Sequence, residues 1–112
     1  MTDFIKSGQR TIQLETDAVK ELSSRIDLPF VTACETILCC EGRVVVIGMG
    51  KSGHIGNKIA ATLASTGTPA FFVHPGEASH GDLGMITKGD VVIAISNSGN
   101  TSEILTLIPL IV

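Results

Sequence analysis

The chain has 112 residues, 44% of them hydrophobic, and a formal net charge of −3 at pH 7. This length predicts one domain at most, and the apolar content is enough for a core, which excludes a disordered chain. The acidic balance argues against nucleic acid as the main partner, and no apolar run reaches the roughly 18 residues of a membrane span.

Two helices are predicted before the first strand. Apolar residues at helical spacing predict a helix over residues 8 to about 26. A second helix is expected from Pro29, because proline suits the first helical turn, to Gly42, a typical helix end. The second segment also holds the three cysteines, at positions 34, 39 and 40, which we expect to pack within the helix. This cysteine usage favours a reduced, cytoplasmic protein.

Strands and helices alternate in the rest of the chain. Short apolar runs predict three buried strands, separated by a helix, a polar loop and a turn, and followed by another helix. In order, the strands are residues 43–47, 70–73 and 91–95; the helix is 53–65 with Gly67 as its cap; the loop is 74–84; the turn is 88–90; the last helix starts near Thr101. This order predicts a parallel, doubly wound α/β sheet, which binds ligands at the carboxyl ends of its strands.

A glycine-rich turn, "GMGKSGHIGNK", follows the first predicted strand as Gly48–Lys58. A Walker A loop would need glycine where Val45 stands, so that pattern fails. Three glycines match the dinucleotide fingerprint, but the acidic residue that should hold the ribose is missing at the end of the next strand, and the first acid is Glu77. A tight turn without any ligand is the remaining alternative.

A second polar turn, "SNSGNTS", follows the third predicted strand as Ser96–Ser102. Its hydroxyls and the N–H groups of a helix start suit a compact tetrahedral anion such as phosphate. The alternative is an ordinary helix cap built by Thr101. Because Lys51 and Ser52 are expected at the same end of the sheet, the two turns together favour a phosphate site.

The segments "GMGKSGHIG", "STGTPAFFVHPGEASHGDLGM" and "SNSGNTSE" closely resemble the sugar isomerase (SIS) domain family, in the group that acts on arabinose 5-phosphate. The resemblance runs from about Gly42 to Pro109. It implies a flavodoxin-like SIS domain, here truncated after about three strands. It also implies interconversion of D-arabinose 5-phosphate and D-ribulose 5-phosphate through an enediolate, for synthesis of the lipopolysaccharide sugar Kdo or for related capsule and sugar-alcohol pathways.

The resemblance also implies roles for particular residues. An aldose–ketose isomerase needs an acid, a base and stabilisation of the enediolate. Lys51 would stabilise the developing oxyanion, Glu103 would transfer the proton, and His80 would polarise a sugar oxygen or bind a metal. The plainer interpretations are a solvated turn lysine and a helix-start acid favoured by the dipole. The residues implied for phosphate binding are Ser52, Ser96, Asn97, Ser98 and Thr101.

We expect no cofactor and no metal. A zinc site from His54, His74 and His80 is an alternative, but it lacks ligand spacing on one element. His54 and His74 are expected to be structural, packing a helix start and a strand end. The expected partner is a sugar phosphate, with no nucleic acid or membrane. The resemblance implies a homo-oligomer, a tetramer for the full-length family.

The chain stops within the apolar stretch of residues 108–112, so we expect residues 1–112 to be the N-terminal part of an SIS domain. The resemblance implies further strands, helices, site residues and two CBS domains beyond it. Such a part would carry some of the site without turning over substrate alone. Two other functions stay open: a non-catalytic SIS sugar-phosphate sensor, and an SIS isomerase of a different sugar phosphate, such as a hexulose 6-phosphate or sedoheptulose 7-phosphate.

Overall fold

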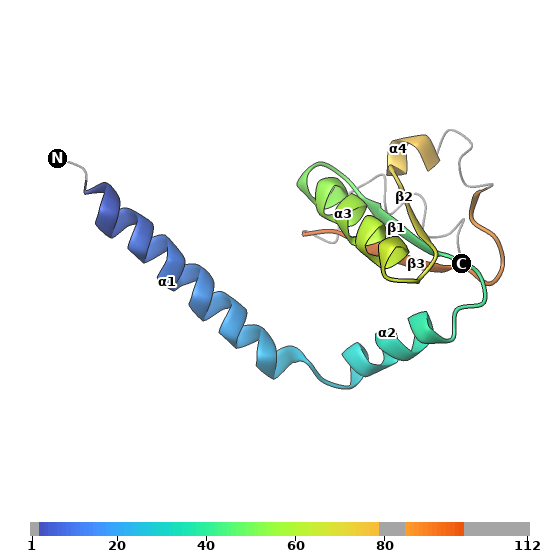
Figure 1. The fold of residues 1–112 in the computed structure, drawn as a ribbon, viewed down its shortest axis with the longest axis horizontal. Helices are drawn as coiled ribbons and strands as arrows, with labels where there is room; N and C mark the ends of the chain where they lie inside the picture. Colours follow the sequence, from blue (N-terminus) through green and yellow to red (C-terminus); the bar gives the residue numbers. More distant parts are fainter. Residues whose placement is uncertain (1–2, 79–84, 98–112) are drawn as a thin grey trace. The chain divides into compact units, whose positions relative to one another are not determined.

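The computed structural model of the chain describes residues 3–78 and 85–97. The chain divides into two compact units, residues 1–35 and 36–112. The first unit contains the helix α1 (Phe4–Leu22), the short 3-10 helix η1 (Ser23–Arg25) and most of α2 (Leu28–Leu38) (Figure 1). Among the described residues, no helix is both long enough and apolar enough to cross a membrane.

Both leading helices differ in length from the prediction. α1 begins at Phe4, four residues earlier than predicted, because the Asp3 side chain caps it by accepting a hydrogen bond of 3.0 Å from the Lys6 N–H. Its α-helical part ends at Leu22, and η1 completes the predicted span. α2 begins one residue before Pro29 but ends at Leu38, so the prediction that Gly42 ends this helix is wrong.

The second unit is built on a parallel sheet of three strands, β1 (Val44–Gly48), β2 (Ala70–Val73) and β3 (Val91–Ile95). Their order in the sheet is β2-β1-β3, and Val44 is paired with Ala70 on one side and with Val91 on the other. The predicted parallel α/β sheet is therefore confirmed, with strand limits within one residue of those expected.

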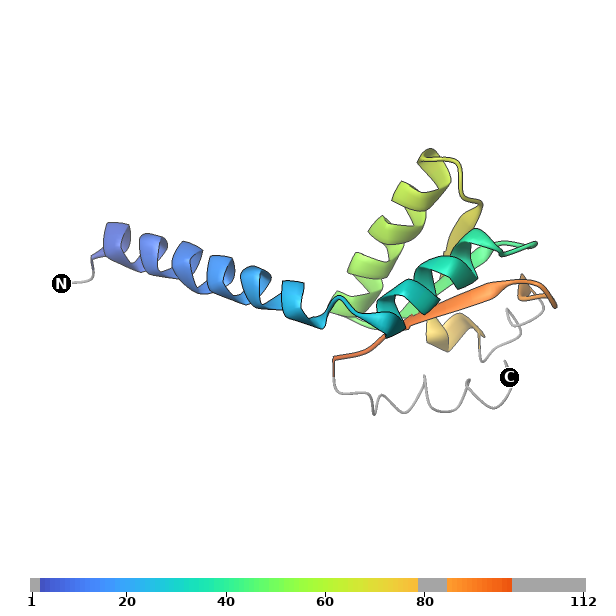
Figure 2. The same ribbon diagram turned by 90° about the horizontal axis from the view of Figure 1, so that it is seen from below.

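β1 forms the centre of the core. Its residues alternate between two apolar clusters, one on each face of the sheet. Val44 and Val46 pack with Ala60 of α3 (Lys51–Ser65), which Figures 1 and 2 show along one face. Val45 and Ile47 pack with Val73 on the other face. A central parallel strand is apolar on both faces for this reason, as the sequence predicted.

The segments that connect the strands agree only in part with the prediction. α3 ends at Ser65, and Gly67 follows in a left-handed conformation with φ +103°, which confirms its predicted capping role. The segment after β2 is not entirely loop as predicted, because Pro75–Ala78 forms the short helix α4. The predicted helix from Thr101 lies outside the described residues.

Candidate functional site

The turn between β1 and α3 is built around Gly50. This glycine stands at φ 56° and ψ −126°, with no atom within 4 Å of the position of a Cβ, so its backbone conformation rather than crowding requires glycine. α3 begins at Lys51, two residues before the predicted start. The first-turn N–H groups of Lys51 and Ser52 have no acceptor within the helix, and the helix dipole makes this end positive.

Three other glycines bring α3 close to the strands. A Cβ on Gly48 would lie 2.7 Å from the Ser52 carbonyl oxygen, and one on Gly53 would lie 2.9 Å from the Gly48 carbonyl oxygen. One on Gly56 would lie 3.1 Å from a Val46 methyl carbon. The spacing of Gly48, Gly50 and Gly53 matches a dinucleotide fingerprint, but the close packing of α3 and the conformation of the turn account for it. This is the geometry expected for the tight turn that the sequence offered as an alternative.

The second predicted turn starts beside the first. Gly48 is paired with Ile95, so Ser96 and Asn97 continue past the carboxyl end of β3 next to the β1–α3 turn. Ser52 and Ser96 are half-buried, whereas Lys51 and Asn97 are exposed. The prediction that the two segments share one end of the sheet is confirmed for these four residues. Ser98, Thr101, Glu103 and His80 lie outside the described residues.

A groove adjoins the glycine turn on the β2 side. It has a volume of about 380 Å³ and lies between one face of α3 and the end of β2. Its lining consists of Gly50, Gly53, His54, Asn57, Phe72 and His74. His54 is exposed, so the expectation that it packs the helix start is wrong. Sequence reasoning missed Asn57 and Phe72 as lining residues, although positions 50, 53, 54 and 57 have the spacing of one helix face.

His74 is held by a local hydrogen bond. Its Nδ1 accepts a partly buried hydrogen bond of 3.1 Å from the Gly76 N–H at the start of α4. His74 is half-buried and follows Val73, which is buried. The expectation that His74 packs a strand end is therefore confirmed, but the same ring also lines the groove. His54 and His74 both line it, whereas His80, the third member of the alternative zinc site, is not among the described residues.

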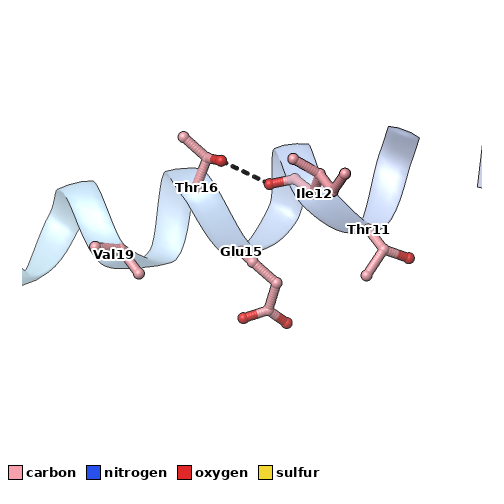
Figure 3. A pocket seen from close by; sticks show the side chains of 5 residues that line it. All are labelled: Thr11, Ile12, Glu15, Thr16 and Val19. Carbon is pink, nitrogen blue, oxygen red and sulfur yellow. Dashed lines mark hydrogen bonds between the residues drawn. The ribbon is translucent and has the colours of Figure 1, made fainter. Parts of the chain in front are cut away.

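A second depression lies on α1 and differs in construction. Figure 3 shows its lining side chains along a single helix, and they are Thr11, Ile12, Glu15, Thr16 and Val19. The Thr16 hydroxyl donates a hydrogen bond of 2.7 Å to the Ile12 carbonyl oxygen, as the dashed line marks. Because all the walls come from one helix and this hydroxyl is already bonded within it, the depression supplies no converging ligand groups.

The amino ends of the strands carry a different polar cluster. The Asp90 carboxylate accepts hydrogen bonds from the N–H groups of Arg43 at 2.7 Å and Thr87 at 2.8 Å. These bonds, led by that from Arg43, lower the pKa of Asp90. A Cβ on Gly42 would collide with the Asp90 carboxylate and approach the Gly89 backbone, which is why glycine stands there although α2 has already ended. This cluster connects the starts of β1 and β3, at the opposite end of the strands from the glycine turn.

Comparisons with known proteins agree with this geometry. The family profile described as SIS domain matches residues 37–112. The arabinose 5-phosphate isomerases KdsD of Pseudomonas aeruginosa and Escherichia coli K12 are 72% and 61% identical to the chain over 109 residues, 97% of the chain. The chain spans about a third, 33%, of the length of each of these curated relatives.

Solved structures show the same fold. The structure of c3406 from E. coli CFT073 in complex with arabinose 5-phosphate superimposes with a TM-score of 0.87 at 50% identity, over 98% of this chain and 60% of the other. A putative phosphosugar isomerase involved in capsule formation from Bacteroides fragilis superimposes with a TM-score of 0.88 at 41% identity, over 97% and 58%. With its profile match, its relatives and its parallel sheet in agreement, the chain belongs to the SIS domain family.

Proposed function

We propose that the chain carries part of the active site of an arabinose 5-phosphate isomerase, which interconverts D-arabinose 5-phosphate and D-ribulose 5-phosphate. The observation that carries the proposal is the position of the β1–α3 turn beside Ser96 and Asn97 at one end of a sheet. The 72% identity to the P. aeruginosa isomerase supports this substrate, as does the related structure in complex with arabinose 5-phosphate.

The phosphate would be held between the two turns. The first-turn N–H groups of α3 and the dipole of that helix favour an anion. Hydroxyl groups on both turns complete the proposed site, and the residues are Ser52, Ser96, Ser98 and Thr101, with Asn97 beside them. Holding the phosphate uses binding energy remote from the reacting carbons to position them.

The chemistry transfers a proton between C2 and C1 of the open-chain sugar. A base takes the proton from C2 of the aldose, and the carbonyl electrons move to the C1 oxygen, which takes up the proton of the C2 hydroxyl. The resulting enediolate is protonated at C1 by the conjugate acid of the base, and the C2 oxygen becomes the carbonyl oxygen of the ketose. We assign the proton transfer to Glu103 and the stabilisation of the oxyanion to the Lys51 ammonium. His80 would polarise the carbonyl oxygen. Lys51 stands exposed in the first turn of α3, so the ammonium can move to a ligand without breaking a packed contact.

We propose a cytoplasmic homo-oligomer, a tetramer, that serves synthesis of Kdo or a related sugar. The relatives' greater length supports the expectation that further site residues are needed beyond those of this chain. The 112-residue chain alone is therefore expected to bind sugar phosphate weakly and to show no turnover.

The test uses the full-length protein that the gene encodes and measures formation of ribulose 5-phosphate from arabinose 5-phosphate. Lys51→Ala and Glu103→Gln are each expected to lower kcat by about 100-fold or more, with the fold retained. Lys58→Ala is the matched control, because Lys58 is also an exposed lysine of α3 but lies two turns further along the helix.

Two results would contradict the assignment in different ways. Tight binding of sugar phosphate without turnover would identify a sensor and return Glu103 to a capping role. Faster turnover of a hexulose 6-phosphate or sedoheptulose 7-phosphate than of arabinose 5-phosphate would identify an SIS isomerase of another substrate. A panel of these sugar phosphates therefore accompanies the assay.

A further inference from the structure

We propose that His74 is a specificity-determining residue that donates a hydrogen bond from Nε2 to a hydroxyl group of the sugar, within the groove between α3 and the end of β2. This inference rests on the proposed function. It concerns a part of the molecule beside the two phosphate-binding turns, and it assigns the groove to the carbon chain of the substrate.

The imidazole ring of His74 is held in one tautomer by its hydrogen bond to Gly76. Because Nδ1 accepts the hydrogen bond from the Gly76 N–H, the proton of the neutral ring is on Nε2, which is then a donor. The ring also lies close to the backbone of Gly76, where a side chain would crowd it. A Cβ on Gly76 would lie only 3.2 Å from Nδ1 and 3.3 Å from Cε1. The backbone on either side is anchored, because Val73 and Pro75 are both buried. His74 therefore presents a donor that is oriented before any ligand arrives.

His74 also stands close to the proposed phosphate-binding turn. Val73 is paired with Ile47, so His74 stands level with Gly48, where the glycine turn begins. Gly50 and Gly53 of that turn form part of the wall of the groove. A sugar whose phosphate is held by the turn can thus extend its carbon chain along α3 toward His74.

The lining of the groove is chemically suited to a sugar chain. Among the described residues that line the groove, none carries a fixed charge, and the polar groups are the amide of Asn57 and the two imidazoles. Phe72 adds one apolar surface. The volume of about 380 Å³ is in the range of small-molecule sites. Neutral donors and acceptors beside an aromatic ring suit the hydroxyl groups of an open-chain sugar better than a second charged group.

Two substitutions separate contact with the substrate from support of α4. In His74→Asn the side-chain oxygen stands near the position of Nδ1, so it can still accept from the Gly76 N–H, but the donor at Nε2 is lost. In His74→Gln the amide nitrogen reaches the position of Nε2, so the donor is retained and the bond to Gly76 is lost. The complete gene product is assayed for kcat/KM with arabinose 5-phosphate, and binding of inorganic phosphate is measured in parallel.

The expected result is a fall in kcat/KM of about 10-fold in His74→Asn and of less than about threefold in His74→Gln, with phosphate affinity unchanged in both. In addition, we expect one analogue of arabinose 5-phosphate that lacks a single hydroxyl to bind the wild type more weakly than arabinose 5-phosphate does. The same analogue and arabinose 5-phosphate should bind His74→Asn with equal affinity. The lost hydroxyl would be the one that His74 contacts.

The opposite pattern would overturn the proposal. If His74→Asn behaves as wild type while His74→Gln loses activity, His74 acts only by holding α4. Equal losses in both variants, or none in either, also overturn it. Absence of turnover in the wild type would instead refute the proposed function, and the comparison of affinities for arabinose 5-phosphate among the three proteins would still decide the role of His74.

Discussion

The two ends of the same parallel sheet use their polar groups in opposite ways. At the amino ends of the strands, the Asp90 carboxylate accepts from two backbone N–H groups and from the Thr87 hydroxyl at 3.2 Å. At the carboxyl ends, the first turn of α3 presents N–H groups without helical acceptors next to Ser96. Groups satisfied within the chain contribute to stability, whereas groups left open are available to a ligand.

The Arg43 side chain at the amino end of β1 is also held by contacts within the chain. Its guanidinium Nη2 donates a hydrogen bond of 2.8 Å to the Met85 carbonyl oxygen, and Cζ lies 4.3 Å from the centre of the Phe71 ring. The chain thereby holds this guanidinium at the amino end of the sheet. Lys51, at the other end, stands exposed. The comparison indicates that the Arg43 guanidinium serves the fold, whereas the Lys51 ammonium is available to a ligand.

The largest expected effect comes from Gly48→Ala, which disrupts the turn between β1 and α3 at the carboxyl ends of the strands. The new methyl group would lie 2.7 Å from the Ser52 carbonyl oxygen and 2.8 Å from its carbon, both backbone atoms, so α3 must shift. We expect a loss of about 3 kcal/mol in the free energy of unfolding, together with loss of phosphate binding. Urea unfolding and calorimetry of phosphate binding measure the two. Gly8→Ala is the control, because nothing lies within 4 Å of its Cβ position and alanine favours a helix interior.

Asp90→Ala is expected to have the next largest effect on stability, and it acts at the amino ends of the strands. It leaves the Arg43 and Thr87 N–H groups without their acceptor, for a loss of about 2 kcal/mol in unfolding free energy. Because the cluster lies at the opposite end of the strands from the glycine turn, phosphate affinity should change by less than about twofold under conditions where the protein stays folded. A large loss of affinity with little loss of stability would contradict the division between the two ends.

The sequence predicted those parts of the fold that depend on neighbouring residues. The run of β-branched residues at 44–47 predicted a central strand, and Gly67 predicted the end of α3, because each signal is local. The shared position of Lys51, Ser52 and Ser96 followed from the direction of parallel strands. The start of α1 could have been predicted from Asp3, because an acidic residue is a common helix cap. The pattern of apolar residues alone did not indicate this start.

Other features depend on contacts between distant residues and could not be predicted in this way. Gly42 resembles a helix end in the sequence, but its role is set by Asp90 and Gly89, 48 and 47 positions away. The groove depends on the close approach of α3 to β1 and β2, where a Cβ on Gly56 would lie 3.1 Å from Val46 and 3.2 Å from the Phe72 ring. α4 starts with a proline and a glycine, a poor helix sequence, and its first turn is supported by the His74 ring.

Gly50→Ala sharpens the comparison because it changes conformation without crowding. No atom lies within 4 Å of the new methyl group, but φ 56° with ψ −126° is strained for any residue with a Cβ. We expect a loss of about 1 to 2 kcal/mol in stability and a larger fractional loss of phosphate affinity, since the turn relaxes by changing the direction of its N–H groups. Urea unfolding and calorimetry again give both values. Unchanged affinity alongside reduced stability would show that this turn does not hold the phosphate.

The smallest expected effect is the pH dependence of the stability that Asp90 contributes at the amino ends of the strands. Hydrogen bonds from the Arg43 and Thr87 N–H groups lower the pKa of Asp90 in the folded protein, so its contribution to stability is fully present above the ordinary pKa and is lost as the pH falls through the lowered value. The difference in urea midpoint between wild type and Asp90→Asn should therefore shrink over that acidic interval. Asp90 is only half-buried, so solvent screening keeps the change small. A difference that grows on acidification would mean that the neutral acid, rather than the carboxylate, is the form the fold favours.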